Sequence, residues 1–239
     1  MAFAFLYPLL FSIFELMKKL LLVVIILFSI PTLAQKIPKG FVYLHDIDST
    51  IKAELRYISH HNFIGKPIDG YFKNTVITTK KAAISLKIIQ KKLIPFQLSL
   101  KIFDAYRPQQ AVNHFVRWAN VLNDTLMKHD YYPTIPKNKL FELGYIAEKS
   151  GHTRGSTVDL TIVDLKTDAE LDMGSPYDFF GIQSHPMYSK ITKIQRANRL
   201  LLRNLMLSNG FIPYENEWWH FTLKNEPFPK TYFNFPVDQ

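Results

Sequence analysis

The chain has 239 residues, a formal net charge of +9 and no cysteine. The absence of cysteine excludes a thiolate nucleophile, a cysteine-ligated metal and a lipid anchor on cysteine, so any metal ion must be bound by His, Asp or Glu. The positive charge comes from scattered lysines rather than a nucleic-acid-binding motif, and we therefore expect no nucleic-acid partner. Nothing in these numbers indicates an oligomeric state.

The N-terminal segment has the order of residues that is typical of a secretory signal peptide. Two lysines follow Met17, an apolar run covers residues 20–30, and small residues lead to Ala34. The run is shorter than the roughly 18 apolar residues of a membrane-spanning helix. We therefore predict a leader over residues 1–34 and an exported, periplasmic or otherwise extracytoplasmic protein. Because residues 1–16 are also apolar, translation that starts at Met17 and an uncleaved membrane anchor are both alternatives.

Residues 35–239 are expected to form one domain with a sizeable core. This segment contains no internal repeat and no Gly/Ser-rich or Pro-rich linker. A core of this size needs no disulfides, so the lack of cysteine is compatible with export. An exported protein with this charge could associate loosely with the cell wall or a membrane surface, since both are anionic.

The first predicted elements of this domain are a short strand and a helix. Residues 41–44 are β-prone, and residues 48–50 are expected to cap a helical turn that runs to Leu55. Thr78 or Thr79 is expected to cap a longer helix that ends at Pro95. Its apolar stripe comprises Ala82, Leu86, Ile89 and Leu93.

A second strand and helix follow directly. Residues 97–103 alternate as a strand, and Pro108 is well placed as the first residue of the next helix. The buried stripe of that helix comprises Ala111, Val112, Phe115, Val116 and Ala119. Residues 123–137 have weak periodicity, and we expect an irregular segment there.

The remaining elements complete a mixed fold. Residues 158–163 alternate as a half-buried strand, a long helix ends near Gly210, and residues 218–223 form a strand. The apolar stripe of the long helix comprises Ile194, Ala197, Leu201 and Leu205. Because helices and strands are mixed without a regular βαβ repeat, we predict an α+β fold with a mostly antiparallel central sheet and flanking helices.

Three segments concentrate reactive side chains at the ends of these elements, where a rigid scaffold can present a site. Residues 150–159 place His152 in a Gly-rich loop and Asp159 at the start of a strand. Residues 217–220 read Glu-Trp-Trp-His, and residues 104–108 read Asp-Ala-Tyr-Arg-Pro at a strand-to-helix junction.

Two imidazoles and one carboxylate, from His152, Asp159 and His220, form a set typical of catalytic zinc. Zinc lowers the pKa of bound water towards about 7 and polarises a carbonyl, and a nearby carboxylate must then move a proton. Glu217 is the candidate. Residues three apart on a regular strand point to opposite faces, so Glu217 must lie in a turn or bulge before the strand to reach the same metal as His220.

These motifs resemble those of the D-Ala-D-Ala dipeptidases in the peptidase M15 group. The wider group includes D,D-carboxypeptidases and L,D-endopeptidases, and hedgehog signalling domains have a similar fold. The Ser-x-His-x-x-Gly-x-Ala-x-Asp pattern of the group covers residues 150–159, with Thr157 in place of alanine, and its Glu-x-Trp-His pattern matches residues 217–220 fully. We expect Thr157 to alter packing rather than metal binding. Further similar stretches lie at residues 57, 62–71, 172–179 and 227–236.

The resemblance implies a zinc peptidase that hydrolyses D-Ala-D-Ala to two D-alanines. His152, Asp159 and His220 would bind one Zn²⁺. Glu217 would act as general base and acid, and Arg107 would stabilise the oxyanion of the tetrahedral intermediate.

The resemblance also implies contacts with both ends of the substrate. Asp178, together with Tyr57, would bind its free ammonium group, and Ser150 would bind its carboxylate. An enzyme that senses both ends of a dipeptide rejects longer peptides.

Each assignment has a simpler structural alternative. Arg107 could only pair with Asp104, Tyr57 could be an ordinary core aromatic, and Asp178 could cap a turn. The tryptophans at 218–219 are expected to pack around the site rather than to contact substrate.

Two other functions are compatible with the motifs. A D,D-carboxypeptidase or L,D-endopeptidase that acts on peptidoglycan peptides would need an open groove instead of an ammonium site. A non-catalytic cell-wall-binding protein would have no need of Glu217. Export would separate the enzyme from cytoplasmic dipeptide, so we expect a role in cell-wall turnover rather than in vancomycin resistance.

Overall fold

The computed structural model describes residues 17–18 and 37–238, so nearly all of the predicted leader lies outside the described residues. Within the described part, no helix is long and apolar enough to cross a membrane. The core residues all lie between Phe41 and Val237, so the segment from Ile37 onward builds its own core. Its strands are β1 (Phe41–Tyr43), β2 (Lys52–Ala53), β3 (Ile77–Thr79), β4 (Leu98–Asp104), β5 (Thr157–Asp164), β6 (Phe211–Tyr214) and β7 (Glu217–Leu223). Its helices are α2 (Leu44–Ile47), α3 (Lys80–Leu93), α4 (Gln109–Asn120), α5 (Lys128–Tyr131) and α6 (Lys193–Leu207).

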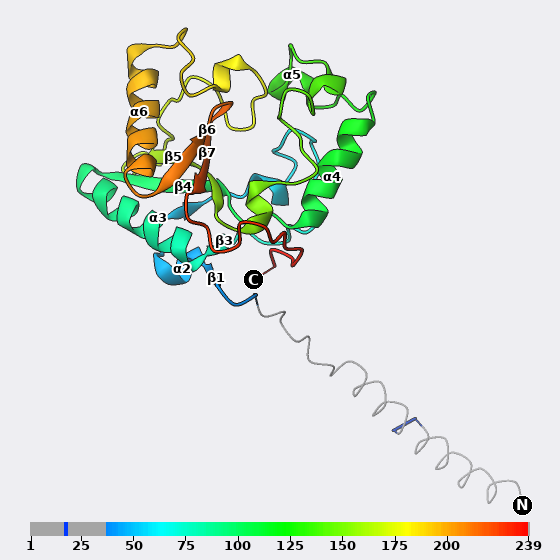
Figure 1. Cartoon of the computed structure of the whole chain (residues 1–239), viewed down its shortest axis with the longest axis horizontal. Helices are drawn as coiled ribbons and strands as arrows, with labels where there is room; N and C mark the ends of the chain where they lie inside the picture. The colour runs from blue at the N-terminus through cyan, green and yellow to red at the C-terminus, as the bar shows by residue number, and fades with distance from the viewer. Residues whose placement is uncertain (1–16, 19–36, 239) are drawn as a thin grey trace, which may run out of the picture. The chain divides into compact units, whose positions relative to one another are not determined.

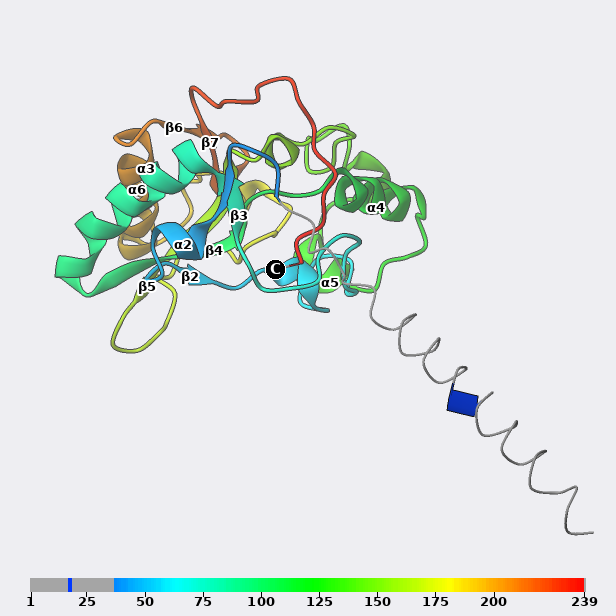
Figure 2. The same ribbon diagram turned by 90° about the horizontal axis from the view of Figure 1, so that it is seen from below.

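A five-stranded sheet in the order β2-β4-β5-β7-β6 forms the centre of the domain. β2 pairs parallel with β4, and the other neighbours in this sheet pair antiparallel. β1 and β3 form a separate antiparallel pair. Figures 1 and 2 both show α3 and α6 at one side of this domain and α4 and α5 at the other. The predicted α+β class with a mostly antiparallel sheet is confirmed.

The helices α3 and α4 form for the reasons that the sequence indicates. The Thr79 hydroxyl caps α3 by accepting a hydrogen bond from the Ala82 amide, at 3.4 Å. Pro108 stands at the N-cap of α4, one residue earlier than predicted. The predicted stripes are buried, with Val116 partly so.

Three predictions about local structure are wrong or incomplete. The helical turn predicted after residues 48–50 does not form. Instead α2 precedes Asp48, whose carboxylate accepts hydrogen bonds from the amide and hydroxyl of Thr50 and so closes a local turn. The segment 123–137 is not wholly irregular, because it contains α5. The strand β5 is buried on both faces rather than on one, since the alternating side chains from Thr157 to Val163 are all buried.

The buried face of α6 also differs from the predicted stripe. Leu205 packs against the core, but Ile194, Ala197 and Leu201 are exposed. The helix buries Arg199, Leu202 and Met206 instead. A prediction from apolar periodicity assumes that every arginine faces solvent. Because Arg199 is buried, α6 turns a different face to the core than the apolar stripe predicts.

The last residues of the chain close over the loop before β5. The Phe233 amide donates to the carbonyl of Thr153 at 3.0 Å, and Val237 pairs with Tyr71. Phe235 stacks on Tyr106 with ring centroids 4.0 Å apart. This C-terminal segment therefore holds the loop next to His152.

Candidate active site

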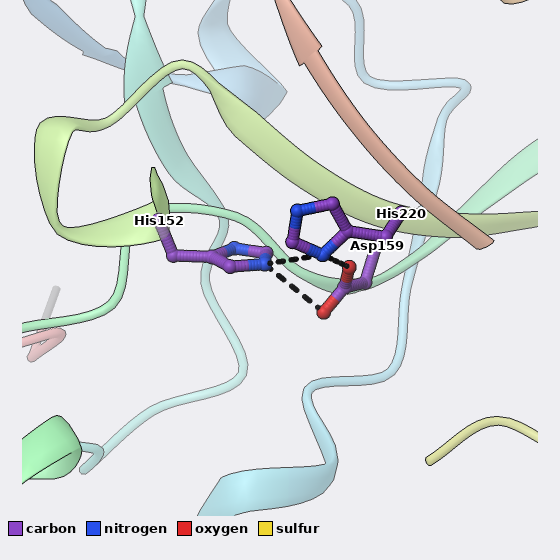
Figure 3. Close-up of side chains that lie close together, drawn as sticks. All are labelled: His152, Asp159 and His220. Atoms are coloured by element: carbon purple, nitrogen blue, oxygen red, sulfur yellow. Dashed lines mark hydrogen bonds and ion pairs between the residues drawn. The ribbon is translucent and has the colours of Figure 1, made fainter. Parts of the chain in front are cut away.

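The three predicted metal ligands meet at one point, and the sheet brings two of them together. Asp159 and His220 are cross-strand partners in the β5–β7 ladder. His152 reaches them from the short helical turn before β5 (Figure 3). Asp159 Oδ2 lies 3.2 Å from His152 Nε2, Asp159 Oδ1 lies 3.1 Å from His220 Nδ1, and the two imidazole nitrogens are 3.4 Å apart.

The turn that carries His152 is fixed at both ends. The Ser150 hydroxyl accepts a hydrogen bond from the His152 amide at 3.2 Å, which caps the turn. Gly155 ends it at φ +84°, where a Cβ would lie 2.1 Å from the Phe41 ring. His152 Nδ1 is 2.7 Å from the carbonyl oxygen of Ala105, to which it donates. This bond sets the tautomer and leaves Nε2 free to bind a metal.

The electrostatics of Asp159 fit a metal site. Burial alone would raise its pKa, but the imidazoles of His152 and His220 outweigh burial and hold the pKa well below its usual range. Asp159 Oδ1 is buried, and no group of residues 17–18 or 37–238 partners it in hydrogen-bond geometry. In the part of the chain that the structure describes, these three residues form the group that could hold a metal ion. Two imidazoles and a carboxylate are a zinc-type donor set.

Glu217 reaches the same point because the β6–β7 ladder is irregular. Tyr214 pairs with Glu217, whereas the preceding Pro213 pairs with Phe221, so the register shifts between them. The shift lets two residues three apart face the same side, and Glu217 Oε2 lies 3.3 Å from His220 Nδ1. The expected irregularity is present, although Glu217 is the first residue of β7 rather than a residue before it.

Arg107 is held by a buried carboxylate and also faces the site. Its Nε donates to Asp104 Oδ2 at 2.8 Å, and its Nη2 lies 3.5 Å from Asp159 Oδ2. Asp104 also accepts a hydrogen bond from the Tyr71 hydroxyl at 2.6 Å. Burial raises the pKa of Asp104, and the charge of Arg107 offsets part of this rise. The pairing with Asp104 therefore positions Arg107 instead of removing it from the site.

A pocket of about 250 Å³ lies in front of these groups. Its volume is below the range of about 300–1,000 Å³ that is usual for drug-sized ligands, so it suits a small molecule. All of the predicted site residues line it, namely Tyr57, Arg107, Ser150, His152, Asp159, Asp178, Glu217 and His220.

The other end of the pocket contains a buried carboxylate with a hydroxyl partner. The Tyr57 hydroxyl donates to Asp178 Oδ2 at 2.9 Å, and both residues are buried. Asp178 forms no salt bridge within the described residues, and burial raises its pKa well above its usual value. Its φ of +61° is a left-handed conformation, which Asp adopts more readily than most residues. Tyr57 is thus both a core aromatic and a pocket residue.

Comparison with protein-family models matches residues 38–238 to the peptidase M15 family, described as D-Ala-D-Ala dipeptidase. The chain belongs to this family. A D-alanyl-D-alanine dipeptidase of Enterococcus faecalis is 42% identical over 198 residues, which cover 83% of this chain and 98% of that protein. D-alanyl-D-alanine dipeptidases of Enterococcus faecium and Streptomyces coelicolor are 39% and 40% identical, over 83% and 82% of this chain and 98% of each relative.

In this M15 peptidase, sequence reasoning missed some residues that complete the site. The Tyr177 hydroxyl lies 3.2 Å from both Asp159 Oδ2 and the Tyr57 hydroxyl, so it links the two ends of the pocket. Tyr177 directly precedes Asp178 in the sequence, and this position could have predicted that it lies at the site. Tyr145 and Ile146 also line the pocket, but they lie among turns and bends over residues 141–149, outside the predicted elements and motifs. Trp218 and Trp219 are buried and do not line this pocket, as expected.

Proposed function

We propose that this protein is a zinc-dependent dipeptidase that hydrolyses D-Ala-D-Ala to two D-alanines. The observation that carries the proposal is that one small pocket has two chemically different ends. A zinc-type donor set with Glu217 lies at one end, and the buried carboxylate of Asp178, which forms no salt bridge with any described residue, lies at the other. The relatives named D-alanyl-D-alanine dipeptidase, at 39–42% identity, support the same substrate.

At the metal end, His152, Asp159 and His220 would hold zinc. The bound metal would lower the pKa of a water ligand towards about 7 and polarise the scissile carbonyl. Glu217, which lines the same pocket, would take a proton from the attacking water and give it to the leaving amine. Arg107 is fixed by Asp104, and its guanidinium would stabilise the charge that develops on the carbonyl oxygen.

At the other end, Asp178 would bind the free ammonium group of the substrate. A buried carboxylate is costly when it is ionised alone, and an ammonium group supplies the missing charge. The Tyr57 hydroxyl holds the carboxylate in place. The Ser150 hydroxyl, which lines the pocket near the metal ligands, would donate to the substrate carboxylate. A substrate bound at both ends in this way must be short.

We further propose that the enzyme is exported and acts on D-Ala-D-Ala released during cell-wall turnover, in the periplasm of a Gram-negative source. The basic, apolar and small-residue order of the N-terminal segment supports export, and the family match begins only at residue 38. Loose association with the wall or a membrane surface is part of this proposal, because the net charge is +9. Mass spectrometry of the cell-derived protein is expected to show a chain that begins at Gln35. A chain that retains residues 1–34 in the membrane fraction would contradict a cleaved leader.

The catalytic proposal is tested by D-alanine release with zinc from two substrates, D-Ala-D-Ala and a pentapeptide that ends in the same dipeptide. We expect cleavage of the dipeptide alone, with loss of activity in Glu217→Ala. Cleavage of the pentapeptide would instead indicate a carboxypeptidase and overturn the role of Asp178. Release from neither substrate, with zinc bound, would favour a non-catalytic binding protein.

A further inference from the structure

The loop that carries Asp178 closes around a buried arginine of α6. Arg199 is 4% exposed, and its partners are backbone carbonyls and one hydroxyl rather than a carboxylate. Its Nε donates to the carbonyl of Met173 at 2.5 Å, and its Nη1 donates to that of His185 at 2.8 Å. Its Nη2 donates to the carbonyl of Gln183 at 2.8 Å, and the Ser175 hydroxyl lies 3.4 Å away. We call residues 173–185 the Asp178 loop.

These contacts lie on both sides of Asp178. Met173 and Ser175 precede it in the chain, and Gln183 and His185 follow it, so one guanidinium group joins the two ends of the loop. Asp178 lies between them in a left-handed conformation, which persists only where the surrounding structure determines it.

Other side chains support the same closure. The Ser184 hydroxyl donates to the carbonyl of Phe179 at 2.6 Å. Trp218, next to Glu217 on β7, donates from Nε1 to the Ser175 hydroxyl at 3.0 Å. The Asp178 loop is therefore fixed from α6 and from the strand that carries the proposed base.

Arginine suits this position for a physical reason. A buried cation is costly unless its donors are satisfied, and burial lowers the pKa of Arg199 to about 10. The planar fork of a guanidinium reaches several acceptors in fixed directions at once. A lysine has one nitrogen on a flexible stem and cannot hold both ends of the loop in the same geometry.

We propose that Arg199 is a positioning residue for substrate recognition, which places Asp178 against the ammonium group of the dipeptide by tying both ends of the Asp178 loop. This inference rests on the proposed function of Asp178. Arg199 does not line the pocket, so it acts through the loop rather than by contact with substrate. Misplacement of a binding group by about 1 Å can cost on the order of 100-fold in rate.

The test compares kcat/KM for D-Ala-D-Ala with that for D-lactyl-D-alanine, in which a hydroxyl replaces the ammonium group. The ratio of the two values on one preparation does not depend on the fraction of folded enzyme. We expect Asp178→Asn to lower this ratio, and Arg199→Met to lower it by about tenfold to 100-fold. Arg199→Lys should fall between wild type and Arg199→Met. The control is Arg196→Met, which removes a cation of the same helix whose Nη2 binds the carbonyl of Ser189, outside the loop, and should keep the wild-type ratio.

The double variant Asp178→Asn/Arg199→Met separates positioning from general stability. If Arg199 acts through Asp178, the double variant should have the same ratio as Asp178→Asn alone. A further fall in the ratio, or an unchanged ratio in Arg199→Met when Asp178→Asn lowers it, overturns the inference about Arg199. An unchanged ratio in Asp178→Asn itself overturns the proposed ammonium site. If Arg199→Met yields no folded protein, Arg199→Lys decides: a lowered ratio supports positioning, and a wild-type ratio overturns it.

Discussion

Asp159 and Asp178 are two buried carboxylates of one pocket, and their surroundings shift their pKa values in opposite directions. Asp159 lies on a strand, and two imidazoles lower its pKa despite burial. Asp178 lies on a loop, its nearest polar partner is a neutral hydroxyl, and burial raises its pKa. Imidazoles compensate the first carboxylate, whereas the second forms no salt bridge within the described residues and, in the proposed function, binds the ammonium group of the substrate. This difference separates the end of the pocket built for chemistry from the end built for recognition.

The largest effect is expected at the chemical end. Glu217→Gln keeps the size of the side chain but removes the carboxylate that is proposed to move the proton, so kcat should fall by about 10²–10⁴-fold with little change in KM. Steady-state kinetics with zinc measure this, and zinc content by mass spectrometry is the control. A loss of zinc together with activity would mean that Glu217 serves the metal rather than the proton.

At the recognition end, Asp178→Asn should lower kcat/KM for D-Ala-D-Ala by about tenfold to 100-fold, in line with roughly 1.5–3 kcal/mol for a hydrogen bond to a charged group. The amide tolerates the left-handed backbone conformation, so the loop should be kept. Kinetics at saturating zinc measure the effect. An unchanged kcat/KM would place the ammonium group of the substrate elsewhere.

The same substitution should stabilise the metal-free protein, which sharpens the contrast between the two carboxylates. Asp178→Asn should raise the free energy of unfolding at pH 7 by about 1–3 kcal/mol, since it removes a buried carboxylate that forms no salt bridge with the residues that the structure describes. Asp159→Asn should lower it, because the imidazoles lose their partner. Denaturant unfolding in the presence of a chelator compares the two variants, and a shift of the same sign in both would remove the contrast.

The pH dependence of stability should differ in the same way. The folded pKa of Asp178 lies above its unfolded value of about 3.9, so the folded state binds more protons and stability falls as the pH rises from about 4 towards the folded pKa. The folded pKa of Asp159 lies below its unfolded value. Its contribution to the free energy of unfolding is therefore present above about pH 4 and is lost in acid. Unfolding curves of the metal-free protein between pH 4 and pH 8 measure this dependence. Asp178→Asn should remove the fall in stability with rising pH that is assigned to Asp178. A slope that persists in this variant would have to come from another group.

The smallest effect is expected at the link between the two ends. Tyr177→Phe removes a hydroxyl that lies 3.2 Å from Asp159 Oδ2 but leaves the ring, which stacks on Phe103. Zinc affinity should weaken by about tenfold, which is the lower limit of the loss that is usual when a hydrogen-bond partner of a metal ligand is removed. Competition with a chromophoric chelator measures it, and Tyr145→Phe is a matched control on the pocket wall. An equal effect in both variants would show that Tyr177 has no special role.

The sequence predicts the chemical end of the site better than the scaffold around it. His152, Asp159, Glu217 and His220 could be predicted because their chemistry requires those residue types at short spacing. The sheet brings Asp159, Glu217 and His220 together, and the turn before β5 adds His152. The fold class and the faces of α3 and α4 followed from periodicity. The face of α6 could not be predicted this way, because the carbonyls that satisfy Arg199 come from another segment.

The turn at Asp48 shows a different limit. A short acidic and hydroxylated stretch can cap a helix or close a turn, and its local sequence does not distinguish the two outcomes. The wall residues Tyr145 and Ile146 have no periodic signal, because they lie in a turn in which both of their amides donate to the carbonyl of Leu140.

The pairing of Asp159 with His220 in the β5–β7 ladder has an evolutionary consequence. Because side chains alternate along a strand, one residue inserted within β5 or β7 would turn a ligand to the opposite face. Loops outside the ladder carry no such constraint, and they tolerate changes in length. Descendants of this fold can therefore acquire new substrate preferences by exchanging loops such as residues 173–185, while the sheet keeps Asp159, Glu217 and His220 in the same arrangement.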